Sequence, residues 1–389
     1  MKSVTMFVWN NFVNDARVLR EAKALEELNY SVTIIAKKEL TEMDLKKSER
    51  ISNNIVVNRP LKWELPKRLR NKFKTTILNK HLPNALLMLK MIMLGRSYDT
   101  DVYHAHDLNT LIQGIVSSKL RLKKKVLIYD SHEVQTSRTH YNFNTIYRIE
   151  KFLLKFVDEV IVENETRADY HYNLYKKYPT VIHNYSELYD IDQYKAMDLR
   201  HTYHIPDDKK IVLYQGGMQE GRGLFKLLEA FKNIEGASLF MIGDGKERQN
   251  LIAKHHDLRL EDKVHFIDRV PYQLLRQYTK AADLGIQFLE NTNFNHYSAS
   301  SNKLFEYLMA HVPVIGSRLP EIEKIIDGEA VGLTVEEGNT KQLQEAIERM
   351  LADDDLLMNF KAHTKTAKLK YNWEVDKVVL QDLYKKINF

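Results

Sequence analysis

Short apolar runs recur along the chain, and a longer segment with helical spacing follows most of them. The first run, 4–9, has the composition of a buried strand, and a helix is expected from about Asp15 to Leu28 with Asn14 or Asp15 at its N-cap. Later runs in the first half are expected to form strands over 31–36, 101–104, 125–129 and 158–162. Strands separated by helices predict a parallel, doubly wound α/β sheet with right-handed crossovers.

The same alternation starts again after an interruption. Residues 185–205 show no clear amphipathic period, and the run before them ends near Asn184. A second series of strands is then expected over 211–215, 238–242, 264–267, 284–288, 313–315 and 331–335. A chain of 389 residues is also too long for one ordinary core. We therefore expect an N-terminal Rossmann-like domain over 1–190, a second Rossmann-like domain over 205–370 and a terminal helix within 371–389.

Composition narrows the class of protein. Apolar residues make up 44% of the chain and charged residues 28%, which is typical of a soluble globular protein. There is no cysteine, which excludes disulfides, thiolate metal ligands and a cysteine nucleophile, and suits a reducing cytoplasm. The N-terminal run is strand-like rather than a signal peptide, and the longest apolar stretch, 85–94, is too short to span a bilayer. The net charge of +6 favours anionic partners.

Much of that positive charge lies in the segment 59–96, where basic side chains alternate with apolar ones and Glu64 is the only acid. Two interpretations remain open. The segment forms a basic amphipathic helix that lies on an anionic membrane surface, or it is a helix of the first domain whose lysines face water. Nucleic acid is not expected as a partner, because no recognition module accompanies the charge.

The stretch 298–316 carries the clearest chemistry. Ser300 and Asn302 are suited to cap a helix whose first turns hold Lys303 and Glu306. Free N–H groups at a helix start attract phosphate, and the lysine adds a full positive charge. A second phosphate-binding candidate is the glycine-rich loop 216–223, where glycines let the backbone approach a diphosphate and Arg222 can grip its oxygens.

The order Lys303-Leu-Phe-Glu306-Tyr, followed after five residues by Pro313-Val-Ile-Gly316, resembles the donor-site signature of the family 4 glycosyltransferases. These are retaining enzymes of the GT-B type, with two facing Rossmann-like domains and a C-terminal helix that crosses back to the first. The resemblance implies that Gly216, Gly217, Arg222, Gly243, Ser301, Asn302 and Lys303 surround a nucleotide sugar. It also implies that Glu306 accepts hydrogen bonds from the ribose.

The match has departures on the donor side. Arg222 stands where the family usually has lysine, and Gly217 replaces an arginine, so one cationic contact is missing unless Lys303 supplies it. Ser298 takes the place of the first glutamate of the family's paired motif. Glu290, Asn293 and Asn295 of the same loop are the candidates to replace that glutamate.

His132, which follows a strand in Tyr129-Asp-Ser-His132-Glu133, is the catalytic candidate. The resemblance implies that it contacts the transferring sugar in a front-face reaction that needs no protein nucleophile. A histidine that merely caps a strand end is the alternative, and that interpretation is preferred for His104 and His106. Metal binding is not expected at Asp99-Thr-Asp101, and Gly243-Asp-Gly245 lacks the third glycine of a dinucleotide fingerprint.

The resemblance implies a retaining glycosyltransferase, which the composition suggests is cytoplasmic, and peripheral attachment to the inner face of the cell membrane is left open. It would move a hexose or N-acetylhexosamine from a nucleotide sugar, with UDP-sugars favoured and no metal or other cofactor required. The expected acceptor is a glycan or a lipid-linked or surface-polymer intermediate. Two other functions remain open: a GT-B-fold sugar-nucleotide epimerase, and a catalytically silent nucleotide-sugar-binding subunit.

Overall fold

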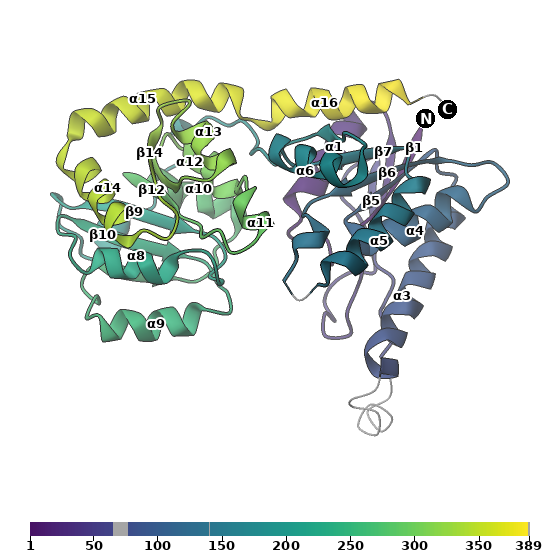
Figure 1. Cartoon of the computed structure of the whole chain (residues 1–389), viewed down its shortest axis with the longest axis horizontal. Coiled ribbons are helices and arrows are strands. Elements are labelled where there is room, and N and C mark those ends of the chain that lie inside the picture. Colours follow the sequence, from purple (N-terminus) through teal and green to yellow (C-terminus); the bar gives the residue numbers. More distant parts are fainter. Residues whose placement is uncertain (65–76, 140, 388–389) are drawn as a thin grey trace. The chain divides into compact units, whose positions relative to one another are not determined.

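The computed structural model describes residues 1–64, 77–139 and 141–387. The chain forms two compact units. Unit 1 comprises Met1–Ile182 together with Lys377–Phe389, and unit 2 comprises His183–Asp376 (Figure 1). Each unit is built around its own parallel sheet.

Unit 1 holds an eight-stranded sheet in the order β3-β4-β2-β1-β5-β6-β7-β8. All its strand pairs are parallel except β3 with β4. Its strands are β1 (Ser3–Phe7), β2 (Ser31–Ile35), β3 (Ser48–Arg50), β4 (Ile55–Asn58), β5 (Val102–His106), β6 (Val126–Ser131), β7 (Glu159–Val162) and β8 (Thr180–Val181). The helices of its described residues before β8 are α1 (Ala16–Glu27), α3 (Ile77–Ser97), α4 (Leu108–Lys119), η1 (Gln135–Ser137), α5 (Phe143–Leu153), η2 (Leu154–Phe156) and α6 (Glu165–Tyr175).

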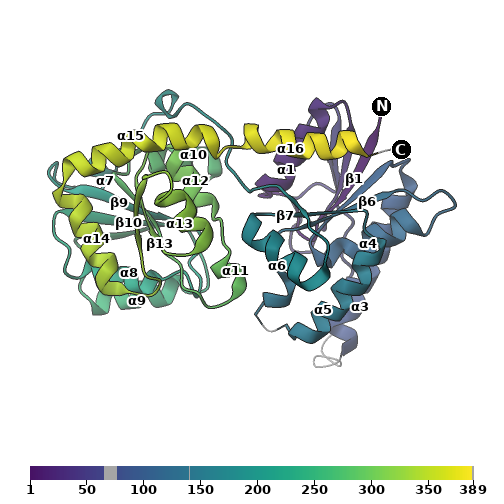
Figure 2. The ribbon, with the colours of Figure 1, turned by 45° about the horizontal axis from the view of Figure 1, so that its top comes forward.

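The central strands of unit 1 are buried along nearly their whole length, as expected of a sheet covered by helices on both faces. Every residue of β5 is buried, and Phe7, Leu87, Leu111 and Leu127 join the same apolar core from four different elements. Helix α4 packs against β5 and β6, and Figure 2 shows it beside β6. The carboxyl ends of the parallel strands β1, β5 and β6 therefore carry their loops to one edge of the sheet.

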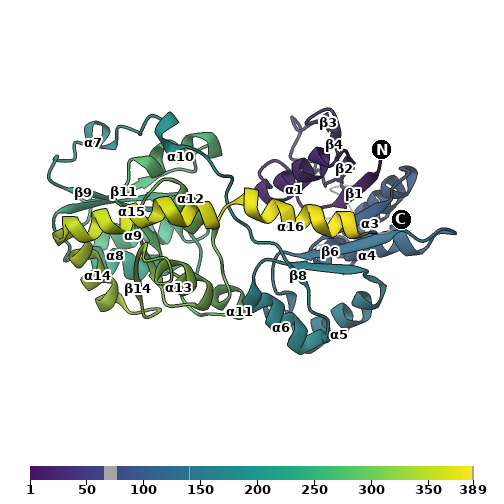
Figure 3. The ribbon, with the colours of Figure 1, turned by 90° about the horizontal axis from the view of Figure 1, so that it is seen from above.

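The last helix, α16 (Trp373–Lys386), packs on unit 1. Tyr384 is fully buried there: its ring meets that of Tyr30 at 5.6 Å between centroids, and its hydroxyl lies 2.9 Å from His104 Nδ1. The Gln381 amide donates to the carbonyl of Ala24 in α1, which runs beside α16 in Figure 3. The expected return of the terminal helix to the first domain is confirmed.

Unit 2 holds a six-stranded parallel sheet in the order β11-β10-β9-β12-β13-β14. Its strands are β9 (Lys210–Gln215), β10 (Ala237–Ile242), β11 (Val264–Ile267), β12 (Leu284–Gln287), β13 (Val314–Ser317) and β14 (Gly332–Val335). Its helices are η3 (Ile191–Gln193), α7 (Leu199–Thr202), α8 (Leu224–Phe231), α9 (Arg248–Asp257), α10 (Tyr272–Lys280), α11 (Phe294–Tyr297), α12 (Asn302–Met309), α13 (Pro320–Ile326), α14 (Thr340–Ala352) and α15 (Asp354–Lys370). The expected α/β class with two Rossmann-like units is confirmed.

The linking region 185–205 is not a free tether. Ile191, Leu199 and Ile205 are buried in the apolar core of unit 2, so most of this region packs as part of that unit. This region shows no hydrophobic periodicity because its apolar contacts come from single residues between short turns.

The expectation of one basic helix over 59–96 is wrong for the described part of that segment. Arg59 is buried and pairs with Glu49 at 2.9 Å, and residues 59–64 are not helical. Lys90 in α3 donates to the carbonyl of Leu61, so it does not point freely into water. Residues 65–76, which hold much of the basic charge, lie outside the described residues. Within the part of the chain that is described, no helix has the length and apolar character needed to cross a bilayer.

Candidate functional site

The first turn of α12 brings Lys303 and Glu306 to the carboxyl edge of the unit 2 sheet. The helix begins at Asn302 with Ser301 at its N-cap, so Ser300 and Asn302 do not cap it as the sequence suggested. The Ser301 side chain makes no capping hydrogen bond, which leaves the helix start available to an anion. Ser300 is buried beside it.

The ammonium of Lys303 is held in an unusual environment. Its side chain is buried, its Nζ lies 4.3 Å from the centre of the Tyr214 ring, and it has no hydrogen-bond partner among the described residues. Burial and the nearby Arg222 cation lower the pKa of the Lys303 ammonium well below its usual value, although Glu306 acts in the opposite direction. A buried cation without a hydrogen-bond partner is destabilising unless a ligand compensates it.

Arg222 belongs to the loop that follows β9. Its Nε is buried without a hydrogen-bond partner within the described chain, and its positive charge contributes to the low pKa of Lys303. The burial of Tyr214 raises the pKa of its hydroxyl to about 12, and that hydroxyl donates to the carbonyl of Gly217 at 2.7 Å, which orders the loop. The charge of Arg222 thus acts on Lys303 in the first turn of α12, and two basic groups near a helix start suit a diphosphate.

Glu306 is oriented by a short relay of polar side chains. Its Oε2 accepts a hydrogen bond from the Gln215 amide at 2.5 Å, and Gln215 Oε1 accepts one from the Thr279 hydroxyl at 2.8 Å. Gln215 and Thr279 are both buried. The carboxylate is therefore held in place with acceptor capacity left for a ligand's hydroxyl groups.

The glycines of the two loops are needed for close backbone packing. Gly243 has φ +144°, and a Cβ placed on it would lie 2.0 Å from the carbonyl oxygen of Gly216. Gly216 has φ +136° and packs against the aliphatic end of Lys303. The loops after β9 and β10 are also joined by a hydrogen bond from the Met218 N–H to the Asp244 carbonyl at 2.9 Å. Larger residues at these glycines would push the loops apart.

The loop before α12 contains the residues that were proposed to replace the family's first glutamate. Ser298 is buried, and its hydroxyl donates to the carbonyl of Phe294. Glu290 forms an ion pair with Lys226 at 2.6 Å, and Asn293 caps α11 by accepting from the His296 N–H. The side chains of Glu290 and Asn293 therefore already have partners within unit 2.

In unit 1, His132 follows β6 and is held from three directions. Its N–H donates to Asp107, and its Nε2 lies 3.1 Å from both Asp130 Oδ2 and His106 Nδ1. Burial favours the neutral ring, but the Asp130 carboxylate outweighs burial and raises the pKa of His132 to about 10. The ring is 22% exposed, and its Nδ1 has no partner among the described residues. The pairing with Asp130 therefore favours the imidazolium form of His132, in which Nδ1–H is a donor without a partner among the described residues.

Behind His132 lies a buried ion-pair network that the sequence analysis did not predict. The Arg17 guanidinium donates to both Asp130 oxygens and to the Ile182 carbonyl, and its Nε lies 3.1 Å from Glu21 Oε1. Arg17 holds the pKa of Asp130 well below its usual range against the opposing effect of burial. Burial together with Asp130 raises the pKa of Glu21 to about 8. The signal in the sequence was a pair of charged residues, at i and i+4, on the apolar face of α1.

Among the described residues, Glu21, His104, His106 and Asp130 place possible ligand atoms within 4.8 Å of one another. This set does not fit a metal ion well. Arg17 already occupies both oxygens of Asp130, and a cation there would lie against the guanidinium. His104 lies within β5 and contacts the Tyr384 hydroxyl, whereas His106 at the end of that strand contacts His132, so only His106 has the position expected of a strand-end histidine. Asp101 accepts from the Ser3 N–H at the opposite edge of the sheet.

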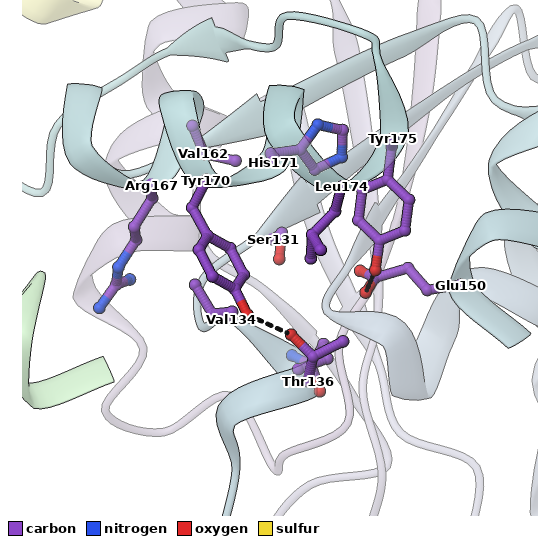
Figure 4. Close-up of a pocket in the computed structure, with 11 residues that line it drawn as sticks. Ser131, Val134, Thr136, Glu150, Val162, Arg167, Tyr170, His171, Leu174 and Tyr175 are labelled. Atoms are coloured by element: carbon purple, nitrogen blue, oxygen red, sulfur yellow. Dashed lines mark hydrogen bonds between the residues drawn. The ribbon is translucent and has the colours of Figure 1, made fainter. Parts of the chain in front are cut away.

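A pocket opens beside the loop that carries His132 (Figure 4). It is lined by Ser131, Val134, Gln135, Thr136, Glu150, Val162, Arg167, Tyr170, His171, Leu174 and Tyr175. Figure 4 shows the Tyr170 hydroxyl directed at Thr136, 3.3 Å away. Glu150, whose pKa is raised by burial, accepts from Tyr129 at 2.8 Å and from Tyr175 at 2.6 Å. The Arg167 guanidinium also donates to the His132 carbonyl, so this lining supports the His132 loop.

The family match and the similar curated proteins described below all point to glycosyl transferases. Residues 197–367 match the family described as "Glycosyl transferases group 1". The chain is 28% identical over 152 residues to the lipopolysaccharide core biosynthesis glycosyltransferase LpsE of Rhizobium meliloti, which is 39% of this chain and 42% of that protein. It is 24% identical over 164 residues to the N-acetyl-alpha-D-glucosaminyl L-malate synthase of Bacillus anthracis, 41% of each. The chain thus matches less than half the length of these relatives.

Solved structures match over nearly the whole chain. Sucrose-phosphate synthase from Thermosynechococcus elongatus superposes with a TM-score of 0.79 at 18% identity, over 99% of both chains. HepE of Anabaena, solved in complex with UDP, superposes with a TM-score of 0.74 at 15% identity, over 100% of both chains. At this level of identity the likeness establishes the fold, which is that of the GT-B glycosyltransferases.

Proposed function

Because residues 197–367 belong to the group 1 glycosyl transferases, we propose that the chain is a cytoplasmic retaining glycosyltransferase, which transfers a sugar from a nucleotide diphosphate to a glycan or lipid-linked acceptor. The observation that carries the proposal is the pair of cations at the start of α12. Lys303 and Arg222 have buried nitrogen atoms without hydrogen-bond partners among the described residues. A diphosphate would supply the missing acceptors.

The nucleotide is proposed to be a uridine diphosphate, as found bound to HepE. In this arrangement Lys303, Arg222 and the N–H groups of Asn302 and Lys303 face the diphosphate, with Ser301 beside them, and Glu306 accepts from the ribose hydroxyls. Gly216, Gly217 and Gly243 allow the backbone to approach the ligand. The surface-polymer acceptor is suggested by LpsE, whose name refers to lipopolysaccharide core biosynthesis.

His132 is proposed to act on the transferring sugar through its free Nδ1–H. The hydrogen bond from Nδ1–H to a sugar hydroxyl fixes the sugar while the bond between the anomeric carbon and the phosphate oxygen breaks and the electron pair passes to the leaving diphosphate. The acceptor oxygen bonds to the anomeric carbon on the same face, and its proton passes to the leaving diphosphate. No side chain of the enzyme becomes covalently attached.

Titration calorimetry with UDP tests the donor site. Arg222→Ala and Glu306→Gln should each weaken UDP binding about ten- to a hundredfold, because a charge-assisted contact to a desolvated group is worth about 1.5–3 kcal/mol. Lys341→Ala, on the exposed face of α14, is the matched control and should leave the affinity unchanged. Unchanged affinity in both site variants would remove the proposed donor site.

Assays with several nucleotide sugars, with and without an acceptor, separate transfer from the two other functions. Transfer requires the acceptor, epimerisation proceeds without it, and a silent subunit shows binding alone. Product that forms without acceptor and retains the nucleotide would replace the proposed function by epimerisation.

Contact of the basic segment 59–96 with anionic membrane is a separate proposal, and it depends largely on residues 65–76, outside the described part of the chain. Co-sedimentation with vesicles should need anionic lipid and should weaken as salt screens the charge. Equal binding to neutral vesicles would contradict it.

A further inference from the structure

Glu21 of α1 is a buried carboxyl group that receives no hydrogen bond. Its side chain is 0% exposed, and neither of its oxygens has a hydrogen-bond donor among the described residues. Arg17 Nε lies 3.1 Å from Glu21 Oε1, but the Arg17 N–H groups donate instead to both Asp130 oxygens and to a backbone carbonyl. A buried carboxylate without a donor is strongly destabilising, whereas a carboxylic acid carries no charge. The geometry therefore favours the protonated form of Glu21.

Asp130 lies next to Glu21 and can accept its proton. His106 Nδ1 is 3.4 Å from Asp130 Oδ2 and 3.9 Å from Glu21 Oε2, so the two carboxyl groups converge on one ring nitrogen. Burial, the Asp130 charge and a hydrogen bond to Asp130 together raise the pKa of Glu21 to about 8. Two buried carboxyl groups this close hold one proton between them, because like charges repel and neither is solvated. The proton lies on Glu21, since Arg17 stabilises the charge of Asp130.

The surrounding groups agree with this assignment. Within the described chain, the titratable and charged groups around Glu21 are Arg17 of α1, His104 and His106 of β5, Asp130 of β6, His132 after it, and Tyr384 of α16. Burial lowers the pKa values of His104 and His106, so their rings are neutral at pH 7. Arg17 and His132 both contact Asp130. The Asp130 carboxylate is thus held by two donors, and the Glu21 hydroxyl supplies a third.

We propose that Glu21 is a positioning residue for His132: it donates its proton to Asp130 and so holds that carboxylate against His132 Nε2. With Nε2 fixed in this way, the ring presents its Nδ1–H to the sugar in the proposed reaction, on which this inference rests. Glu21 is fully buried, so it acts through Asp130 and does not touch a ligand.

Ionisation of Glu21 should end this role. Because its pKa is raised, the proton is retained through neutral pH and is lost as the pH rises above about 8. Asp130 then loses one donor and faces a second negative charge, and the nearby Arg17 Nε is attracted to both carboxylates. The hold on His132 should therefore weaken in alkaline solution.

NMR of the full chain, with carbon-13 glutamate and nitrogen-15 histidine, tests the shared proton directly. Glu21→Gln is neutral at every pH, keeps a donor for Asp130 and identifies the Glu21 signal by its loss. We expect the Glu21 carboxyl to titrate near pH 8. The His132 ring signal should shift over the same range in the parent but not in Glu21→Gln. A Glu21 midpoint near the ordinary value of about 4.3 would overturn the inference.

Turnover supplies the functional readout, measured as UDP released with the nucleotide sugar and acceptor for which transfer is found. The parent should lose about tenfold in turnover between about pH 7 and pH 9.5, the effect expected for one lost hydrogen bond. Glu21→Gln should stay within about threefold of the parent at pH 7 and should lack the alkaline fall. Glu21→Leu fills the same space without a donor and should lower turnover about tenfold at pH 7, with UDP affinity unchanged.

The matched control is Glu27→Gln, which removes an exposed carboxylate of the same helix and should change neither the NMR titration nor the pH profile. Normal turnover in Glu21→Leu, or the parent's alkaline fall in Glu21→Gln, would overturn the positioning role. UDP binding and transfer by the parent would survive either result, so the proposed function would stand. Absence of transfer by the parent with every donor tried would overturn the proposed function and the role of Glu21 together, whatever the Glu21 midpoint.

Discussion

Lys303 shows how a single residue can be placed for a ligand rather than for stability. Its ammonium is buried against Tyr214 and Arg222, and the resulting low pKa means that the folded protein disfavours the charge. Because the unfolded chain then binds the proton more readily, this residue makes folding less favourable at pH values below the ordinary lysine pKa, and stability is regained as pH rises toward it.

Lys303→Met should therefore stabilise the ligand-free protein while weakening UDP binding. An apolar side chain of similar length removes the desolvated charge, and a gain of about 1–3 kcal/mol in the free energy of unfolding is expected. Urea denaturation at pH 7 measures it, with Lys341→Met as the exposed control. A large loss of stability would show that the lysine is compensated within the protein.

His132 is predicted to carry its proton at neutral pH. Its pKa of about 10 lies above the ordinary histidine value, so the pairing with Asp130 stabilises the fold fully below about pH 6.5 and this contribution is lost as pH rises toward 10. NMR titration should show the His132 ring protonated throughout pH 6–8, with His132→Gln identifying its resonances. A midpoint near 6.5 would contradict the proposed cationic donor.

The same substitution separates chemistry from binding. His132→Gln should lower turnover by about a hundredfold or more, as expected for loss of a positioned donor, while UDP affinity stays at the parent value. Normal turnover would leave His132 as a structural residue.

At the scale of elements, the two glycine loops of unit 2 form one backbone-packed layer. Gly243 and Gly236 both have positive φ, but a Cβ on Gly236 would meet nothing within 4 Å, whereas one on Gly243 would collide with the carbonyl of Gly216. Gly243→Ala should thus destabilise by about 2–4 kcal/mol and Gly236→Ala by about 1 kcal/mol. Equal losses in denaturation experiments would mean that backbone conformation alone explains the requirement for glycine.

At the scale of the whole molecule, the chain closes on itself because its last helix completes unit 1. Tyr384 is fully buried beneath Tyr30 and His104, while Val378 of the same helix is 49% exposed. Tyr384→Ala should cost about 3–5 kcal/mol in the stability of unit 1, and Val378→Ala less than about 0.5 kcal/mol. UDP titration of the variant should still show binding by unit 2; a loss of both would show that the units do not fold independently.

The family and the fold were predictable from sequence because they depend on local pattern. Apolar runs that alternate with helical segments specify parallel strands, and the sequence placed β7, β9 and β11 to within a residue or two. The motif from Lys303 to Gly316 indicated the glycosyltransferase family, which the match over 197–367 confirms. The same local argument failed over 59–96, because Arg59 and Lys90 find buried or internal partners that periodicity does not reveal.

The sequence by itself indicated candidate residues such as His132 and Lys303, and the tertiary structure decided which charged groups surround them. Arg17, Asp130 and His132 are far apart in sequence, and only the meeting of α1 with the end of β6 joins them into one network. The charge of a titratable group depends on burial and on the distance to neighbouring charges. In the sequence, Lys303 looks like an ordinary helix lysine. Folding buries its ammonium and brings the Arg222 charge near enough to lower its pKa.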